Sequence, residues 1–237
     1  MARVPPGLKA TRQCASALVL ASRHTYGEVT GNSKELDAKA VWLPENAIDP
    51  VRFPEIHTEP PPPVPGEPLR VAFLGRLVPY KGADMLLEAA APLLRERKMV
   101  LEIIGDGPQM PDLKAIVARE GIDGAVEFPG WVAHGKVRGH LSKARLFAFP
   151  SVREFGGGVV LEAMALGLAP VVLDYGGPAE LVPAGCGTVV PMGGREEIIR
   201  SFREVLARMA ADPMAVHETG LRAQRHVRAH YTWEAKA

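Results

Sequence analysis

The chain has 237 residues, which is enough for one large domain or for one domain with part of another. Its hydrophobic fraction of 47% and charged fraction of 23% are typical of a protein that buries a core of its own. The 28 basic and 27 acidic residues leave a formal net charge of +1, so nothing in the charge favours a nucleic-acid or anionic-membrane partner. Two cysteines, Cys14 and Cys186, exclude a disulfide framework and a cysteine zinc site, and they fit a reducing compartment.

The first 57 residues predict one small strand-helix-strand unit, called the front unit below. Its expected elements are a strand at 17–21, a polar helical stretch near 33–39 and a second strand at 39–43. A unit with two strands cannot close a core alone. We therefore expect the front unit to pack against another part of the protein.

The apolar segments predict neither a secretion signal nor a membrane span. The run 14–21 follows basic residues and so resembles a short signal peptide, but its polar exit at 22–24 favours a buried strand. The longest apolar stretch, 159–173, contains Glu162 and is shorter than the roughly 20 residues that a span needs.

A proline-rich segment at 58–68 separates the front unit from the rest of the chain. Proline fixes φ and lacks an amide donor, so this segment predicts an extended, semi-rigid linker. The chain is therefore expected to have three parts, which are the front unit at 1–57, the linker at 58–68 and a rear domain at 69–233.

The rear domain alternates short apolar strands with helices. The expected strands are 69–74, 100–104, 125–128, 146–149, 169–173 and 187–190. The expected helices are 82–97, 109–120, 134–143, 159–166, 178–182, 195–211 and 213–230. This alternation predicts the α/β fold class, with a doubly wound parallel sheet that binds ligands at the carboxyl ends of its strands.

Several familiar sites are missing from the sequence. The dinucleotide fingerprint fails because Met110 stands at its third glycine position, and no phosphate-binding loop of the G-x-x-x-x-G-K-[ST] type occurs. No C-x-x-C spacing suggests a transition metal, and Ser151 has no nucleophile elbow around it.

The loop at 75–82 carries two cations, Arg76 and Lys81, on one strand-to-helix turn. The amino-terminus of a helix follows at Gly82, and these features together suit a phosphate. A solvated surface loop is the alternative interpretation.

The next glycine-rich loop has three consecutive glycines at 156–158, directly before a helix. Bare amides there allow an anion to approach closely. Glu154 and Glu162 bracket the glycines, and Glu162 stands in an apolar helix start where it needs a partner or a ligand hydroxyl. Together with the cations, these groups suggest a nucleotide joined to a polyol.

A third loop, Tyr175-Gly-Gly-Pro-Ala-Glu180, again opens a helix with glycines and a carboxylate. The Glu180 charge can contact a ligand or can complement the helix amino-terminus, and both interpretations remain open.

Seven motifs follow one another along the rear domain: Phe73-Leu-Gly-Arg76 with Lys81-Gly82, Ile104-Gly-Asp-Gly-Pro108, Val126-Glu-Phe-Pro-Gly-Trp-Val132, the E-x7-E element from Glu154 to Glu162, Gly167, Pro170-Val-Val and Gly176-Gly-Pro-Ala-Glu180. In this order they resemble glycosyltransferase family 4. The resemblance covers about residues 69–233. It implies the GT-B architecture, with two facing Rossmann-like domains, and a retaining, metal-independent reaction.

The resemblance implies a role for each site residue. Arg76 and Lys81 would neutralise the donor diphosphate and stabilise the leaving nucleotide in place of a metal. Glu154 would contact the transferred sugar, and Glu162 would hold the ribose hydroxyls. Arg76, Lys81 and Glu154 are the expected catalytic residues, and no metal or other cofactor is expected. The other donor-binding positions are Gly75, Gly130, Trp131, Val132, Gly157, Gly158 and Val159.

One departure concerns the glycine-rich loop. The family commonly has Glu-Gly-Phe-Gly, whereas here Phe155 follows Glu154 directly and three glycines come next. The spacing of the two glutamates is kept, so the departure affects the expected amide contacts more than the carboxylates.

The front unit resembles the end of the family's amino-terminal acceptor domain, with Pro44-Glu-Asn-Ala in place of the commoner Pro-Asn-Gly. The resemblance thus implies a missing acceptor domain of roughly 150 residues, in cis or in trans. That domain would carry the acceptor site and the catalytic histidine, and none of the seven histidines here is assigned that role.

The leading hypothesis is the donor domain of a retaining glycosyltransferase of the hexosyltransferase type. It would bind a UDP or GDP sugar and support transfer to a hydroxyl of a glycan, a lipid or a small molecule, although this chain alone would bind better than it catalyses. The resemblance places such an enzyme in the cytoplasm or peripherally at the inner membrane surface. Two alternatives remain, a non-catalytic module that binds nucleotide sugars and a nucleotide-sugar epimerase, and the E-x7-E element argues against the epimerase.

Overall fold

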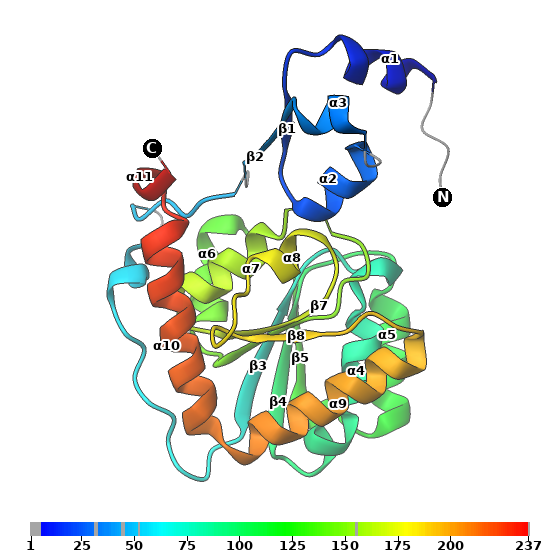
Figure 1. Ribbon diagram of the computed structural model, residues 1–237. Helices are drawn as coiled ribbons and strands as arrows, with labels where there is room; N and C mark the ends of the chain where they lie inside the picture. Colours follow the sequence, from blue (N-terminus) through cyan, green and yellow to red (C-terminus); the bar gives the residue numbers. More distant parts are fainter. Residues whose placement is uncertain (1–5, 31–32, 44–45, 52, 155, 237) are drawn as a thin grey trace.

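The computed structural model describes residues 6–30, 33–43, 46–51, 53–154 and 156–236 (Figure 1). Its main feature is a six-stranded parallel sheet with the strand order β5-β4-β3-β6-β7-β8. The strands are β3 (Leu69–Leu74), β4 (Met99–Ile104), β5 (Val126–Gly130), β6 (Leu146–Phe149), β7 (Ala169–Leu173) and β8 (Thr188–Val190). Because the order reverses between β3 and β6, the carboxyl ends of these two strands form the topological switch point at which such sheets bind ligands.

Helices cover both faces of the sheet, as the alternating pattern predicts. Helices α4, α5 and α9 pack together on one face, and α7 and α10 pack on the other (Figure 1). The helices of this region are α4 (Ala83–Arg95), α5 (Met110–Glu120), α6 (His134–Leu141), α7 (Gly158–Ala165), α8 (Gly176–Glu180), α9 (Arg195–Ala211), α10 (Pro213–His230) and α11 (Trp233–Lys236). Short 3-10 turns lie at η1 (Pro54–His57), η2 (Pro79–Lys81) and η3 (Asp123–Ala125).

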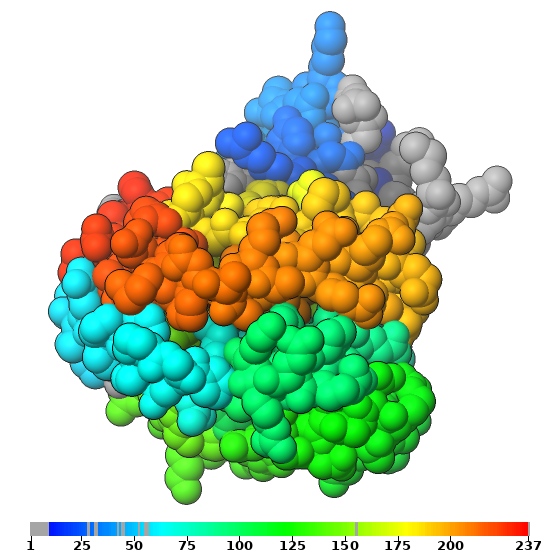
Figure 2. Space-filling model, turned by 90° about the horizontal axis from the view of Figure 1, so that it is seen from below, coloured from blue at the N-terminus to red at the C-terminus, as the bar shows by residue number. Residues whose placement is uncertain are grey.

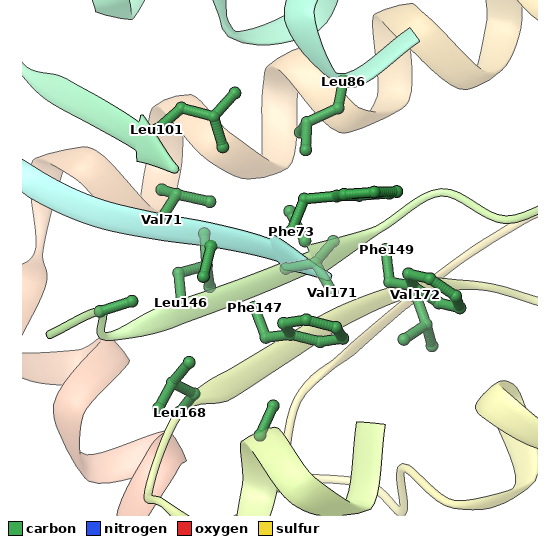
Figure 3. Packing of buried hydrophobic residues seen from close by; sticks show 14 of the residues in the cluster. Val71, Phe73, Leu86, Leu101, Leu146, Phe147, Phe149, Leu168, Val171 and Val172 are labelled. Atoms are coloured by element: carbon green, nitrogen blue, oxygen red, sulfur yellow. The ribbon is translucent and has the colours of Figure 1, made fainter. Parts of the chain in front are cut away.

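The core lies between the sheet and these helices. Phe73, Phe147 and Phe149 come from the two central strands and are almost fully buried. The ring of Phe149 lies 5.9 Å from that of Phe73 and 5.7 Å from that of Phe147, between centroids (Figure 3). This packing fills the core next to the switch point and supports the loops that follow β3 and β6.

The front unit contains two parallel strands, β1 (Leu18–Leu20) and β2 (Ala40–Trp42), and three helices, α1 (Pro6–Cys14), α2 (Arg23–Thr30) and α3 (Lys34–Asp37). The strands and α3 were expected from the sequence, whereas α1 and α2 were not. Val19 and Val41 are paired in register and expose 63% and 50% of their surface. Parallel strands are normally covered on both faces, so this small sheet is incomplete within the described residues.

Contacts from the start of α2 and from Ile48 help to hold the front unit to the rear domain. Glu180 of α8 accepts hydrogen bonds from the amides of Arg23 and His24 at the start of α2 (2.9 and 3.0 Å). The amide of Ile48 donates to the carbonyl oxygen of Tyr231 (2.6 Å) just after α10. The front unit therefore lies next to α8, as Figure 1 shows.

The segment 58–68 forms no helix or strand and runs beside α10 (cyan in Figures 1 and 2). Gln224 of α10 donates to the carbonyl oxygen of Thr58 (3.1 Å), and Arg225 lies 3.5 Å from Glu59. These contacts fix the segment to the rear domain. Across the described residues, no helix combines the length and apolarity needed to cross a bilayer.

Candidate functional site

The loops that follow β3 and β6 meet at the switch point. The hydroxyl of Ser151 and the amide of Val152 both donate to the carbonyl oxygen of Tyr80 (3.3 and 2.9 Å). Gly82 has a φ of 73° and lies directly before α4, and a Cβ there would overlap with the carbonyl oxygen of Pro150. The two loops are therefore fastened together, which brings residues 76–81 beside residues 151–158.

The two predicted cations lie in different environments. Arg76 is exposed, and its side chain forms no hydrogen bond or ion pair with the residues that the structure describes. Lys81 is 15% exposed, and its ammonium lies 5.1 Å from the ring centroid of Phe149 and 5.7 Å from that of Tyr80. Arg76 is thus open to an anion, whereas Lys81 is partly desolvated and already paired.

The partner of Lys81 is Glu154, whose side chain is 19% exposed. The pair joins the η2 turn to the glycine-rich loop, 73 residues later in the sequence. The sequence predicted both residues as parts of one site, and the structure brings them into direct contact. Phe155, the residue that departs from the family pattern, lies outside the described residues, as do Pro44 and Glu45 of the front-unit variant.

The second carboxylate of the E-x7-E element, Glu162, lies one turn into α7 with its side chain 19% exposed. Its Oε1 is 3.3 Å from Nε2 of His134, the first residue of α6. The sequence predicted that Glu162 needs a partner but did not identify this histidine. The available signal was position, because His134 follows the Gly-Trp-Val motif at the end of β5.

The amino-terminus of α7 forms the third side of the site. Gly157 caps the helix with a φ of 71°, in the left-handed region that favours glycine. A Cβ on Gly158 would lie 3.1 Å from Oδ1 of Asn46, so the front unit reaches this helix end. Val159 is half-buried against the core. Because the first amides of a helix lack partners within it, this end of α7 is suited to an anion.

Gly130 is the last residue of β5, and Trp131 and Val132 follow it at the same edge of the sheet. Gly130 has a φ of 76°, and its carbonyl oxygen accepts from the amide of Gly105 (2.9 Å). Val132 packs against the core, while Trp131 exposes 75% of its surface. The predicted donor-binding residues therefore lie along one rim, although Trp131 contacts little of the described protein.

A pocket of about 360 Å³ lies beside Glu162. It is lined by Asn46, Ala47, Ile48, Asp49, Phe53, His134, Gly158, Leu161, Glu162 and Trp233. The front unit and the end of the chain therefore complete a hollow that begins at the carboxyl edge of the sheet. A second pocket of about 400 Å³ lies at the amino ends of β3, β4 and β5 and includes none of the predicted site residues.

The Gly-Asp-Gly-Pro motif has a packing function in this structure. Gly105 has a φ of 139°, and a Cβ there would overlap with the carbonyl oxygen of Gly75. A Cβ on Gly107 would likewise overlap with the carbonyl oxygen of Leu77. These glycines press the turn after β4 against the loop that carries Arg76.

No metal centre is evident in the part of the chain that the structure describes. Among those residues, no group of three or more histidine, cysteine, aspartate or glutamate side chains is placed to hold an ion.

Comparison with known proteins identifies the family. The model of the family described as "Glycosyl transferases group 1" matches residues 68–208, more than half of the chain. The chain belongs to this family. The glycosyl transferases group 1 region thus includes every predicted site residue, from Gly75 to Glu162.

Two curated relatives illustrate the similarity. The chain is 35% identical over 123 residues to an alpha-D-kanosaminyltransferase of Streptomyces kanamyceticus, covering 51% of this chain and 32% of that protein. It is 33% identical over 178 residues to a D-inositol 3-phosphate glycosyltransferase of Kribbella flavida, covering 70% of this chain and 41% of that protein. The chain thus spans well under half the length of these relatives.

Solved structures confirm the predicted fold class, the doubly wound Rossmann-like sheet of GT-B glycosyltransferases. Anabaena HepE in complex with UDP and glucose superposes with a TM-score of 0.76 at 18% identity, covering 95% of this chain and 62% of that one. The sucrose-phosphate synthase of Thermosynechococcus elongatus superposes with a TM-score of 0.75 at 23% identity, covering 96% and 57% of the two chains.

Proposed function

We propose that the rear domain, residues 69–233, binds a nucleoside-diphosphate sugar and supports retaining transfer of the sugar to an acceptor hydroxyl without a metal. The observation that carries the proposal is the convergence of Lys81, Glu154, Glu162 and the amino-terminus of α7 at the switch point, in a chain of this family. UDP in complexes of structurally similar proteins supports the nucleotide part of the ligand.

Different residues of the site bind different parts of the nucleotide sugar. Arg76, Lys81 and the amides at Gly158 and Val159 hold the diphosphate, and the two cations offset the charge that develops on it as the glycosidic bond breaks. Glu162 accepts hydrogen bonds from ribose hydroxyls, oriented by His134. Glu154 accepts hydrogen bonds from hydroxyls of the transferred sugar. Gly75 and residues 130–132 border the nucleoside.

We propose further that the acceptor site belongs to a second domain, joined to the front unit in cis or in trans. The open two-stranded sheet of the front unit supports this, because Val19 and Val41 face outward where a complete parallel sheet is covered. A chain that spans 32% and 41% of two relatives leaves room for such a domain. The acceptor would be a glycan, a lipid or a small molecule.

Calorimetry with UDP, GDP and ADP tests the proposal. We expect saturable binding of at least one of them, and we expect Lys81→Ala or Glu162→Ala to weaken it by about 1–3 kcal/mol, because each change removes a partly buried polar contact. Glu204→Ala, at an exposed position on α9, is the matched control and should leave affinity unchanged. Absence of saturable binding, or unchanged affinity in both variants, would refute the assignment.

A further inference from the structure

The contact between Lys81 and Glu154 joins two groups to which the proposed function gives different parts of the ligand. The ammonium is assigned to the diphosphate and the carboxylate to the sugar, yet in this structure each is the partner of the other. The side chains expose only 15% and 19% of their surface. Because neither charge is well hydrated, water replaces the contact only in part when the pair separates.

Free and sugar-linked nucleotides differ in the new partners that they offer to Lys81 and Glu154. A nucleoside diphosphate supplies anionic oxygens to Lys81 but leaves the Glu154 carboxylate displaced and close to a second negative group, which is unfavourable. A nucleoside-diphosphate sugar supplies the same oxygens and also hydroxyl donors for the carboxylate. Only the second ligand brings a polar group for each member of the pair.

We infer that Glu154 determines the selectivity of this site for sugar-linked over free nucleoside diphosphates, by competing with the diphosphate for Lys81. The inference rests on the proposed function and adds to it a reason for product release. After transfer, the nucleoside diphosphate has lost the sugar that compensated Glu154, so the carboxylate returns to Lys81 and weakens the hold on the product.

The hydrogen bonds between the two loops at 75–82 and 151–158 confine such an exchange to the site itself. Ser151 and Val152 anchor the start of the glycine-rich loop to Tyr80, the residue before Lys81, so the two loops remain together when the pair opens. Exposed Arg76 stays available to the diphosphate throughout, because it forms no ion pair within the described residues. The exchange can therefore proceed while the two loops stay joined at Tyr80.

Isothermal titration of the wild-type chain and of Glu154→Gln tests the inference, with UDP, GDP and ADP and with the glucose conjugate of each. Removing the competing charge should tighten binding of the free nucleotide by about three- to tenfold. Binding of the glucose conjugate should stay the same or weaken, because glutamine still offers one oxygen to the sugar. A gain in affinity cannot arise from misfolding, so the expected result is unambiguous.

Two further variants make the test specific. In a Lys81→Met background, Glu154→Gln should no longer tighten nucleotide binding, because the competition is gone. Asp174→Asn removes an exposed charge at the carboxyl end of β7, on the same edge of the sheet, and should have a smaller effect. If Glu154→Gln and Asp174→Asn raised the nucleotide affinity equally, a general charge effect would explain the result and the inference would be wrong.

The outcomes also separate this inference from the proposed function. If the wild type binds a nucleotide and Glu154→Gln leaves that affinity unchanged or weaker, Glu154 does not compete and the inference alone is wrong. If the wild type binds none of the six ligands, the proposed function fails and this inference fails with it.

Discussion

Gly105 is the residue at which the turns after β3 and β4 touch. Its φ of 139° is rarely adopted by other residues, and a Cβ there would overlap with the carbonyl oxygen of Gly75. Backbone atoms cannot yield as a flexible side chain would, so a substitution here must shift the loop that carries Arg76.

We expect Gly105→Ala to lower the free energy of unfolding by about 2–4 kcal/mol, through strain at positive φ and overpacking. Gly139→Ala is the matched control, because Gly139 lies inside α6 with nothing within 4 Å of a new Cβ. That change should stabilise the chain by about 0.5–1 kcal/mol. Urea unfolding of both variants measures the difference, and similar stabilities would contradict the packing described here.

At this scale the sequence predicted which side chains gather, because residues after neighbouring parallel strands must meet at one edge. It did not predict that Lys81 and Glu154 pair with each other. That contact depends on the hydrogen bonds from the second loop to Tyr80, and no local pattern encodes such bonds. His134 was missed for a similar reason, since only the folded arrangement places α6 opposite Glu162.

Among the elements, α4 and α9 are joined by an ion-pair cluster as well as by apolar packing. Arg195, at the start of α9, donates to Asp84 (2.9 Å) and to Glu88 (3.0 and 3.1 Å) of α4. The hydrogen bonds from Arg195 hold the pKa of Glu88 below its ordinary value of 4.5, although partial burial opposes them. Folding therefore favours the ionised form of Glu88.

Arg195→Met should lower the free energy of unfolding at pH 7 by about 0.5–1 kcal/mol. A carboxyl group with a lowered pKa in the folded state stabilises the fold above its unfolded pKa, and this contribution is lost as the pH falls through the folded value. The difference from the wild type should thus shrink in acid. Urea unfolding between pH 7 and about pH 3 tests this, with the exposed Arg200→Met as control; a difference independent of pH would contradict it.

The rear elements were predictable because their apolar residues recur with clear strand or helix periods. Strands β3, β6 and β7 and helices α9 and α10 begin and end at the predicted residues. The unpredicted helix α2 has a polar sequence, Arg-His-Thr-Tyr-Gly-Glu-Val-Thr, and contains a glycine. Its stability comes from capping by Ser22 and from tertiary contact with α8, which periodicity cannot reveal.

For the whole molecule, Glu180 is one of the residues that attach the front unit to the rear domain. Glu180 is the carboxylate that the sequence left undecided between a ligand and its own helix, and in the structure it caps α2 instead. The ring of His24 also lies 4.6 Å from that of Tyr175, between centroids. The loop from Tyr175 to Glu180 therefore helps to join the front unit to the rear domain.

Glu180→Ala should speed hydrogen exchange of the α2 amides by about fivefold, because loss of a helix cap costs about 1 kcal/mol. Glu180→Gln should be intermediate, since its amide oxygen can accept one of the two bonds. Exchange in α9 and α10 is the internal reference and should not change. Equal protection of α2 in the wild type and in Glu180→Ala would show that the cap does not hold the front unit.

The contacts that hold the front unit also set an order of events during synthesis. Arg23 bonds to a residue 157 positions later, and Ile48 forms a β-bridge with Thr232 close to the carboxyl end. Residues 180 and 232 must therefore leave the ribosome before Arg23 and Ile48 can bond to them, whereas β3 and β4 can pair much earlier. Contacts of such high sequence separation form slowly. The attachment of the front unit is therefore a late step of folding.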